Sequence, residues 1–217
     1  ASTMTSATEA LGLCLSGFAS IPASDSRHSQ MASMTGRRIV EMAWEDLKPS
    51  DILTKASFDN AMSTVLALAG STNSVVHMIA VSRRAGFPLT LDHIDVLARK
   101  VPVLANLRPA GEYLMEDFYY AGGLRALLKQ LSPLLDLSQQ TVDGKSLGEL
   151  IANAKVFKPE VIRSLDNPLV ASDSLAILKG NLAPDGAVIK PPAAESHLLK
   201  HTGKAVVFKN YDDLSAR

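Results

Sequence analysis

Apolar residues recur every three to four positions through the first hundred residues, a spacing that predicts amphipathic helices. The predicted helices span residues 5–15, 28–45, 55–69, 74–84 and 90–100. In the second of them we expect Ile39, Met42 and Ala43 to face the core and Trp44 to pack near the helix end. Pro49 ends this helix within a connector, and Thr54 is placed to cap the next one.

The pattern changes after residue 100. The apolar run VPVLANL, residues 101–107, is typical of a short buried strand. A helix through MEDFYY is predicted to split at Gly122 and Gly123, and Ser146 caps a short helix that reaches Asn153. From Leu175 the stretch LAILKGNLAPDGAVIK predicts a strand, a loop containing Pro-Asp-Gly and a second strand, and AVVF at 205–208 predicts another. This change divides the chain into domains at 1–170 and 171–217.

Composition narrows the classes of partner. The 217 residues carry 22 Lys and Arg against 22 Asp and Glu, so the formal net charge is zero, which argues against nucleic acid or an anionic membrane as partner. No apolar run reaches the roughly 20 residues of a membrane span. The mean hydropathy of +0.11 is high enough to indicate a large buried interface, with another subunit or another domain.

Cys14 is the only cysteine, so a disulfide framework is excluded and a reducing compartment is expected. Its place on an apolar helical face favours a core-filling role. His197 and His201 have a spacing that some metal sites use, but they lie in a Pro- and Lys-rich stretch where a chance pairing is the better interpretation.

The segment GSTN, residues 70–73, has two interpretations. Ser71, Thr72 and Asn73 can cap the helix that follows, with Gly70 allowing the turn. The same hydroxyls and amides at a helix N-terminus can also bind a carboxylate or phosphate. Both interpretations stay open at this point. His77, one turn further along, is expected to be a semi-buried histidine without a catalytic role.

The segment MEDFYYAGG, residues 115–123, places two carboxylates beside two tyrosines and two glycines. Consecutive Glu116 and Asp117 on a helix point about 100° apart, so a solvated or capping role is expected for at least one of them. The pair Gly122–Gly123 indicates a close backbone approach. No catalytic residue and no metal ligand is predicted from these motifs.

Seven stretches in order resemble the dihydroxy-acid and sugar-acid dehydratase family, which includes dihydroxy-acid dehydratase and 6-phosphogluconate dehydratase. They are ASTMTSATEALGL, PASDS, WEDLKPSDILTKASFDNAM, ALAGSTNSVVHMIAVSRRAG, PVLANLRPAGEYLMEDFYYAGG, LDNPL and LAILKGNLAPDGAVIK. WEDLKPSDILT, GEYLMEDFYYAGG and VVFKNYDDL are most similar to the branch that acts on arabinonate, xylonate and gluconate.

The resemblance implies that the chain is an internal fragment of a longer enzyme. The family's cluster-binding cysteines, and a C-D-K motif with a magnesium-binding Asp, would precede Ala1. The remaining magnesium carboxylate and the catalytic Ser would follow Arg217. The implied fold class is α/β: the helix-rich latter part of an α/β N-terminal domain, followed by the first strands of a β-rich, barrel-like C-terminal domain.

The implied activity is that of a hydro-lyase that converts 2,3-dihydroxy carboxylic acids, in particular sugar acids, into 2-keto-3-deoxy acids with an iron–sulfur cluster and magnesium. We expect the fragment alone to be inactive and to hold no cofactor, with Ser71, Thr72 and Asn73 as its substrate contacts. The parent is expected to be a cytoplasmic homo-oligomer, a dimer or tetramer, whose partner is a small-molecule substrate. The alternative is a non-catalytic interaction or scaffold module derived from the family.

Overall fold

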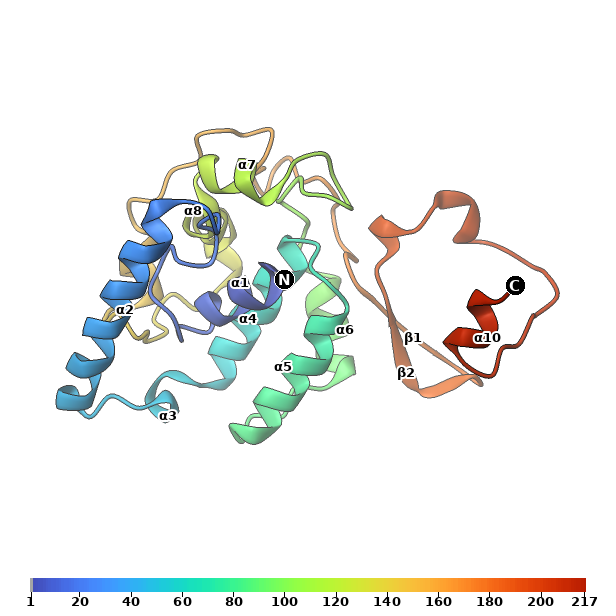
Figure 1. Cartoon of the computed structure of the whole chain (residues 1–217), viewed down its shortest axis with the longest axis horizontal. Helices are drawn as coiled ribbons and strands as arrows, with labels where there is room; N and C mark the ends of the chain where they lie inside the picture. The colour runs from blue at the N-terminus through green and yellow to red at the C-terminus, as the bar shows by residue number, and fades with distance from the viewer. Residues whose placement is uncertain (1) are drawn as a thin grey trace.

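Helix α4, Lys55–Ala67, lies at the centre of the molecule, and ten of its thirteen residues are buried. The computed structural model describes residues 2–217. The predicted cap of α4 is confirmed, because the Thr54 hydroxyl accepts a hydrogen bond from the Ser57 amide at 3.1 Å and the Ser57 hydroxyl accepts one from the Thr54 amide at 2.9 Å. Helices α1, α5 and α6 pack around α4 (Figure 1).

The helices before α7 follow the predicted pattern apart from their ends. They are α1 (Ser2–Ala10), α2 (Ser26–Glu45), α3 (Pro49–Ile52), α4, α5 (Asn73–Arg84) and α6 (Leu91–Ala98). The first ends earlier than predicted because Gly12, at φ +78°, turns the chain away from the helix. The short α3 lies in the segment that was predicted to be a connector without a helix.

The second half of the helical region contains shorter elements. They are α7 (Met115–Tyr120), α8 (Gly123–Leu131), the 3-10 helix η1 (Ser132–Leu134) and α9 (Leu147–Ile151). The predicted split at Gly122 and Gly123 is confirmed, since Gly122 adopts φ +123° between α7 and α8. The Ser146 cap of α9 is confirmed as well, because its hydroxyl accepts a hydrogen bond from the Glu149 amide at 3.3 Å.

Residues 101–107 are all buried, as predicted, but they do not form a strand. They make isolated bridges instead, Val103 with Val170, Ala105 with Ile162 and Leu107 with Tyr113. The partners come from irregular segments, so no continuous ladder can form. The prediction of burial is confirmed, and the prediction of a strand is wrong.

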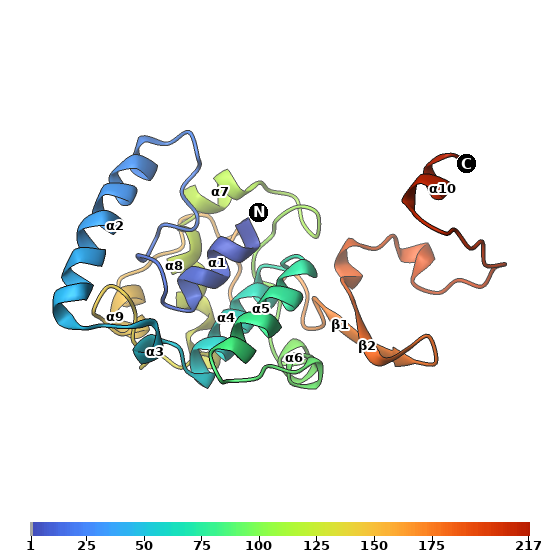
Figure 2. The ribbon, with the colours of Figure 1, turned by 60° about the horizontal axis from the view of Figure 1, so that its bottom comes forward.

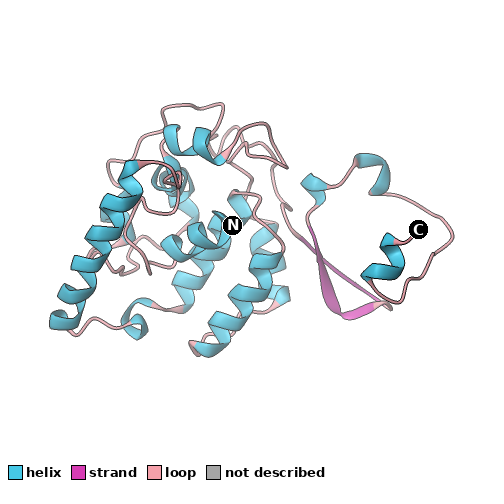
Figure 3. Cartoon of the chain, in the orientation of Figure 1, coloured by secondary structure: helices cyan, strands magenta, loops and turns pink. Residues whose placement is uncertain are grey.

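A two-stranded antiparallel sheet follows the helices, with β1 (Ala176–Gly180) paired to β2 (Ala183–Ile189) (Figure 3). The connection is Asn181–Leu182, so the Pro-Asp-Gly stretch lies inside β2 and its predicted role as the loop is wrong. Pro184 is tolerated there because each strand of a two-stranded sheet has an unpaired edge.

The predicted strand at 205–208 is also wrong. These residues are exposed apart from the partly buried Phe208, and no strand within residues 2–217 pairs with them. The other elements of this region are the 3-10 helices η2 (Pro191–Ala193) and η3 (Ser196–Leu198) and the helix α10 (Tyr211–Ser215). We call residues 2–175 the helical body and residues 176–217 the C-terminal arm (Figures 1 and 2).

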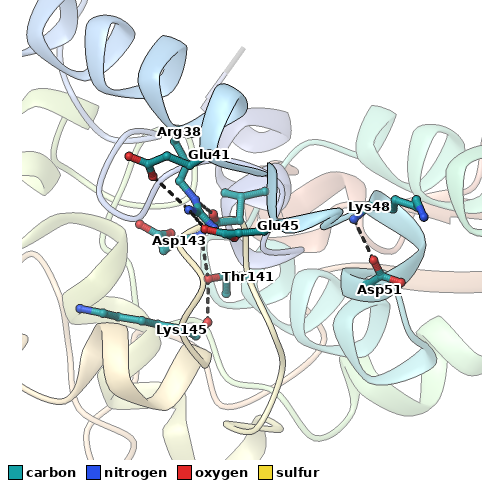
Figure 4. Close-up of polar contacts among 9 residues, drawn as sticks. Arg38, Glu41, Glu45, Lys48, Asp51, Thr141, Asp143 and Lys145 are labelled. Atoms are coloured by element: carbon teal, nitrogen blue, oxygen red, sulfur yellow. Dashed lines mark hydrogen bonds and ion pairs between the residues drawn. The ribbon is translucent and has the colours of Figure 1, made fainter. Parts of the chain in front are cut away.

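Helix α2 contacts the body along one narrow stripe. Met42 is its only buried residue, whereas Ile39 is 58% exposed and Trp44 87% exposed. Ala43 is exposed too, so the predicted core positions other than Met42 are wrong. Arg38 fixes the inner face of α2: its guanidinium donates to the Val142 carbonyl and forms ion pairs with Glu41 and Glu45 (Figure 4).

Buried Glu9 organises the loop that follows α1. Its carboxylate accepts hydrogen bonds from the Gly17 amide at 2.7 Å and the Ala19 amide at 2.8 Å. Burial raises the pKa of Glu9 to about 7, although these two amides oppose the rise. The loop therefore depends on one carboxyl group inside the helical body.

The prediction of an α/β fragment, helix-rich and then entering its first strands, is confirmed. The predicted domain division at residue 170 stays a prediction. Within residues 2–217, every helix is too short or too polar to cross a lipid bilayer.

Candidate anion-binding site

A cavity of about 390 Å³ lies where the start of α1, the α4–α5 connection, the segment after residue 106 and the end of β2 meet. Segments that are far apart in the sequence therefore contribute to one site, and the helical body and the C-terminal arm share it. Its polar lining residues are Ser2, Thr3, Ser6, Ser71, Thr72, Arg108 and Lys190.

The α4–α5 connection forms one wall of the cavity through a close backbone approach to α1. Ala69 adopts φ +45°, and a Cβ added at Gly70 would lie 2.7 Å from the Thr3 methyl carbon. The amide of Ser71 donates to the Thr3 hydroxyl at 3.2 Å. The glycine of the GSTN segment is thus required by close packing against α1 and α4, whereas the left-handed backbone conformation of this turn is adopted by Ala69.

The N-terminus of α5 opens toward this cavity. Ser71 serves the helix start, since its hydroxyl accepts from the Asn73 amide at 3.3 Å and its carbonyl accepts from the Ser74 hydroxyl at 2.6 Å. Thr72 occupies the N-cap position but makes no side-chain capping bond, which leaves its hydroxyl available to a ligand. The helix dipole places partial positive charge at this end.

Two of the three predicted substrate contacts, Ser71 and Thr72, line the cavity, and Asn73 lies outside the lining. The Asn73 side-chain nitrogen is instead 3.3 Å from Nε2 of His77. His77 is exposed, so its predicted semi-buried position is wrong. The helix turns its first residue toward solvent because Ser74 and Val75 occupy the inward face. The role of all three residues in substrate binding stays a prediction.

Both charged residues in the lining are cations. The Lys190 ammonium donates to the Ala69 carbonyl, and burial lowers the pKa of this half-buried lysine. Arg108 is exposed and donates from Nε to the Glu112 carbonyl at 3.0 Å, which leaves its terminal nitrogens free for a ligand. No Asp or Glu is among the lining residues. The cavity is therefore suited to an anion.

Ser6 supplies a further indication of a ligand. Its side chain is fully buried, and its hydroxyl has no hydrogen-bond partner within the described chain. A buried hydroxyl without a partner costs about 1–3 kcal/mol. Because Ser6 also lines the cavity, an oxygen atom of a bound ligand would complete its hydrogen bonding.

The site predicted from the sequence did not include Thr3, Ser6, Arg108 and Lys190. A local signal existed for the first two, which lie one turn apart on a helix that is otherwise packed against α4. No local pattern links Arg108 to Lys190, since only the tertiary fold brings them to one cavity.

The MEDFYYAGG segment has a structural role. Asp117 accepts a hydrogen bond from the Leu114 amide at 2.9 Å, which confirms the predicted capping role for one of its two acids. A Cβ added at Gly122 would lie 2.4 Å from the Lys155 carbonyl oxygen, so the predicted close backbone approach is also confirmed.

The residues of this chain do not fit an iron–sulfur cluster or a magnesium ion. Within residues 2–217 no three His, Cys, Asp or Glu side chains come close enough to hold a metal. Cys14 is partly buried, and its surroundings raise the pKa of the thiol well above its usual value, first by burial and then through Glu9 and Asp143. A neutral thiol is a poor ligand for an iron–sulfur cluster, so Cys14 is unsuited to hold one.

Comparison with known proteins adds the family. A model of the dihydroxy-acid/6-phosphogluconate dehydratase N-terminal domain matches residues 1–150, and a model of the C-terminal domain matches residues 160–217. The chain is 48% identical, over 99% of its length, to a 6-deoxy-6-sulfo-D-gluconate dehydratase of Pseudomonas putida. It is 49% identical, over 96% of its length, to an L-arabinonate dehydratase of Rhizobium leguminosarum bv. trifolii.

A dihydroxy-acid dehydratase of Caldicellulosiruptor bescii is 44% identical over 99% of the chain. The chain spans 38%, 36% and 39% of the length of these three relatives, in the order given. The similarity therefore covers nearly all of this chain and a little over a third of each relative.

Proposed function

This chain belongs to the dihydroxy-acid/6-phosphogluconate dehydratase family, and we propose that it is part of a hydro-lyase that removes water from sugar acids. The proposed substrate is a 2,3-dihydroxy carboxylic acid, and the proposed product is a 2-keto-3-deoxy acid. The chain contributes part of the substrate site.

The cavity beside the α5 N-terminus carries this proposal. A sugar acid has one carboxylate and several hydroxyl groups. Arg108 and Lys190 match the negative charge, and the Ser6 and Thr72 hydroxyls match the hydroxyl groups. The higher identity to the sulfogluconate and arabinonate dehydratases than to the dihydroxy-acid dehydratase supports a sugar acid as substrate.

The proposal assigns an iron–sulfur cluster and magnesium to the parent enzyme, and it assigns none of their ligands to this chain. The residues described here would bind and orient the acid. We also propose that the parent is a cytoplasmic homo-oligomer. The proposed location rests on the single cysteine of this chain, because a chain without disulfides suits a reducing compartment.

A binding experiment with the 217-residue chain tests the site. D-gluconate is titrated in a calorimeter, with uncharged D-glucitol as the matched ligand. We expect weak gluconate binding, with a Kd on the order of 1 mM, and no binding of glucitol. Arg108→Ala and Lys190→Met should each weaken binding, whereas Lys179→Ala, on the same hairpin but outside the cavity, should not. Equal binding of gluconate and glucitol would contradict an anion-binding site. Equal binding of gluconate by all three variants would contradict the assignment of Arg108 and Lys190 to that site.

A second experiment tests the reaction. The purified chain alone is expected to form no 2-keto acid from any aldonate. In a full-length enzyme that contains this segment, Thr72→Val should reduce kcat/KM more than Asn73→Ala, because only Thr72 lines the cavity. The scaffold alternative would be supported by two results together. These are that the 217-residue chain binds no aldonate, and that the full-length protein converts none.

A further inference from the structure

The helical body and the C-terminal arm meet at the candidate anion site, and each supplies one of its cations. Of the thirteen described residues that line the cavity, twelve belong to the body, and Lys190 belongs to the arm. Lys190 directly follows β2 and ties the end of this strand to the body, because its ammonium donates to the Ala69 carbonyl. The cavity therefore has both of its cations only when the hairpin lies against the body.

Few apolar contacts hold the hairpin on the body. Ile177 and Val188 pack partly against the hydrophobic core, and a Cβ added at Gly186 would lie 2.8 Å from a side-chain carbon of Leu91 in α6. No side chain of the arm that the structure describes is buried. Segments with few buried apolar contacts open locally at a low free energy. We therefore expect the hairpin to leave the body far more often than the body unfolds.

The charges of the cavity oppose this docking unless an anion is bound. Lys190 and Arg108 are both cations, and no Asp or Glu is among the described lining residues. Burial of the Lys190 ammonium lowers its pKa, which reflects the cost of moving a charge out of water. The Ala69 carbonyl accepts a hydrogen bond from this ammonium but carries no net charge. A bound carboxylate would offset both the repulsion between the two cations and the burial of an unpaired charge.

We propose that a bound sugar acid docks the C-terminal arm on the helical body by bridging Lys190 of the arm to Arg108 and Thr72 of the body. Such a ligand contacts both regions, so it binds the docked arrangement more tightly than one in which the hairpin is released. A ligand with this difference in affinity shifts the equilibrium toward the docked arrangement. Docking in turn raises the affinity for the ligand by the same factor.

This inference rests on the proposed function, because the bridging anion is the proposed substrate, and it adds a conformational step to binding. Hydrogen–deuterium exchange of the 217-residue chain, read by mass spectrometry, measures the coupling. D-gluconate at about ten times its Kd should slow the exchange of peptides within residues 176–189 about tenfold. D-glucitol at the same concentration should not slow it, because it carries no charge.

Helix α2 is the internal control of this experiment. It is also peripheral, since Met42 is its only buried residue, and none of its residues lines the cavity. Its exchange should be the same with gluconate and with glucitol.

Three variants locate the coupling. Lys190→Met in the arm and Arg108→Ala in the body should each remove most of the slowing at the same gluconate concentration. The effect of Arg108→Ala on the arm is one that a purely local role of this residue in the body would not produce. Lys200→Met, at an exposed lysine of the arm outside the cavity, is the matched control and should keep the slowing. The exchange of α4 in each variant reports whether the body is folded.

Four outcomes would overturn the proposal. Gluconate that binds in the calorimeter but leaves the exchange of the hairpin unchanged would separate binding from docking, and the proposed substrate site would stand. Equal slowing in the hairpin and in α2 would assign the effect to the stability of the whole chain. Equal slowing in Lys190→Met would show that Lys190 is not the bridge. The absence of any gluconate binding would remove the substrate site and this inference together.

Discussion

The helical body and the C-terminal arm differ in how they are stabilised. The buried side chains of the described chain all lie in residues 2–175, and the last is Leu175. In the arm no side chain that the structure describes is buried, and Leu182 at the hairpin turn is 97% exposed. The body therefore has its own hydrophobic core, whereas the arm is a peripheral hairpin with extended segments.

The difference shows that an apolar segment predicted to be a strand is not buried by that pattern alone. A two-stranded hairpin is marginal in water unless another layer covers it. Ile177 and Val188 pack partly against the body, and Lys190 reaches the Ala69 carbonyl. The arm thus takes its position from a few contacts with the body, while it contributes Lys190 to the cavity.

The largest expected effect comes from one substitution made in both regions. Leu127→Ala removes a fully buried side chain from α8 and should lower the free energy of unfolding by about 2–5 kcal/mol. Leu182→Ala, the same change in the arm, should alter it by less than about 0.5 kcal/mol. Urea denaturation followed by circular dichroism measures both. Similar losses for the two variants would show that the arm has a core of its own.

The second prediction concerns the buried acid of the body. Glu9 keeps its proton up to about pH 7 in the folded chain, against a usual pKa of 4.5. Unfolding between these values releases a proton, so this contribution to stability is fully present below pH 4.5 and is lost as the pH rises through 7. At about 1.4 kcal/mol per pKa unit the loss is roughly 3 kcal/mol.

Burial also raises the pKa of Asp143, which adds to the same trend. Urea denaturation at a series of pH values should therefore show a stability that declines from pH 5 to pH 8, and Glu9→Gln should flatten most of the decline. An unchanged slope in this variant would assign the pH dependence to other groups.

The third prediction compares two glycines. A Cβ at Gly70 would lie 2.7 Å from a Thr3 carbon and 2.9 Å from a Val65 carbon, whereas a Cβ at Gly180 in the arm would meet nothing within 4 Å. Gly70→Ala should cost about 1–3 kcal/mol of unfolding free energy, and Gly180→Ala should be close to neutral. Thermal denaturation of both variants measures the difference, and equal melting temperatures would contradict the close approach of α1 to the α4–α5 connection.

The sequence predicted best where local rules decide the structure. The Thr54 and Ser146 caps, the break at Gly122 and the hairpin strands all depend on neighbouring residues, and all are confirmed. The predictions from the sequence failed where contacts between distant segments decide whether a residue is buried. Ile39 and Trp44 fit a core stripe, yet no other element of the described chain covers them.

The candidate site shows the same limit. The hydroxyl-rich start of α5 was evident in GSTN, and two of its residues line the cavity. The two cations of the cavity could not be predicted from the sequence. Arg108 follows a buried segment and Lys190 follows the second strand, so they are far apart along the chain. Their proximity depends on how the arm docks on the body, which no local pattern specifies.

The smallest expected effect tests that docking directly. Lys179 of β1 forms an ion pair with Asp92 of α6, and both side chains are at least half exposed. Exposed ion pairs contribute about 0–1 kcal/mol, and salt weakens them. A double-mutant cycle with Lys179→Ala and Asp92→Ala should therefore give a coupling energy below about 1 kcal/mol that falls in high salt. A larger, salt-resistant coupling would mean that the pair is shielded from water, and that the arm docks more firmly than its exposed surface indicates.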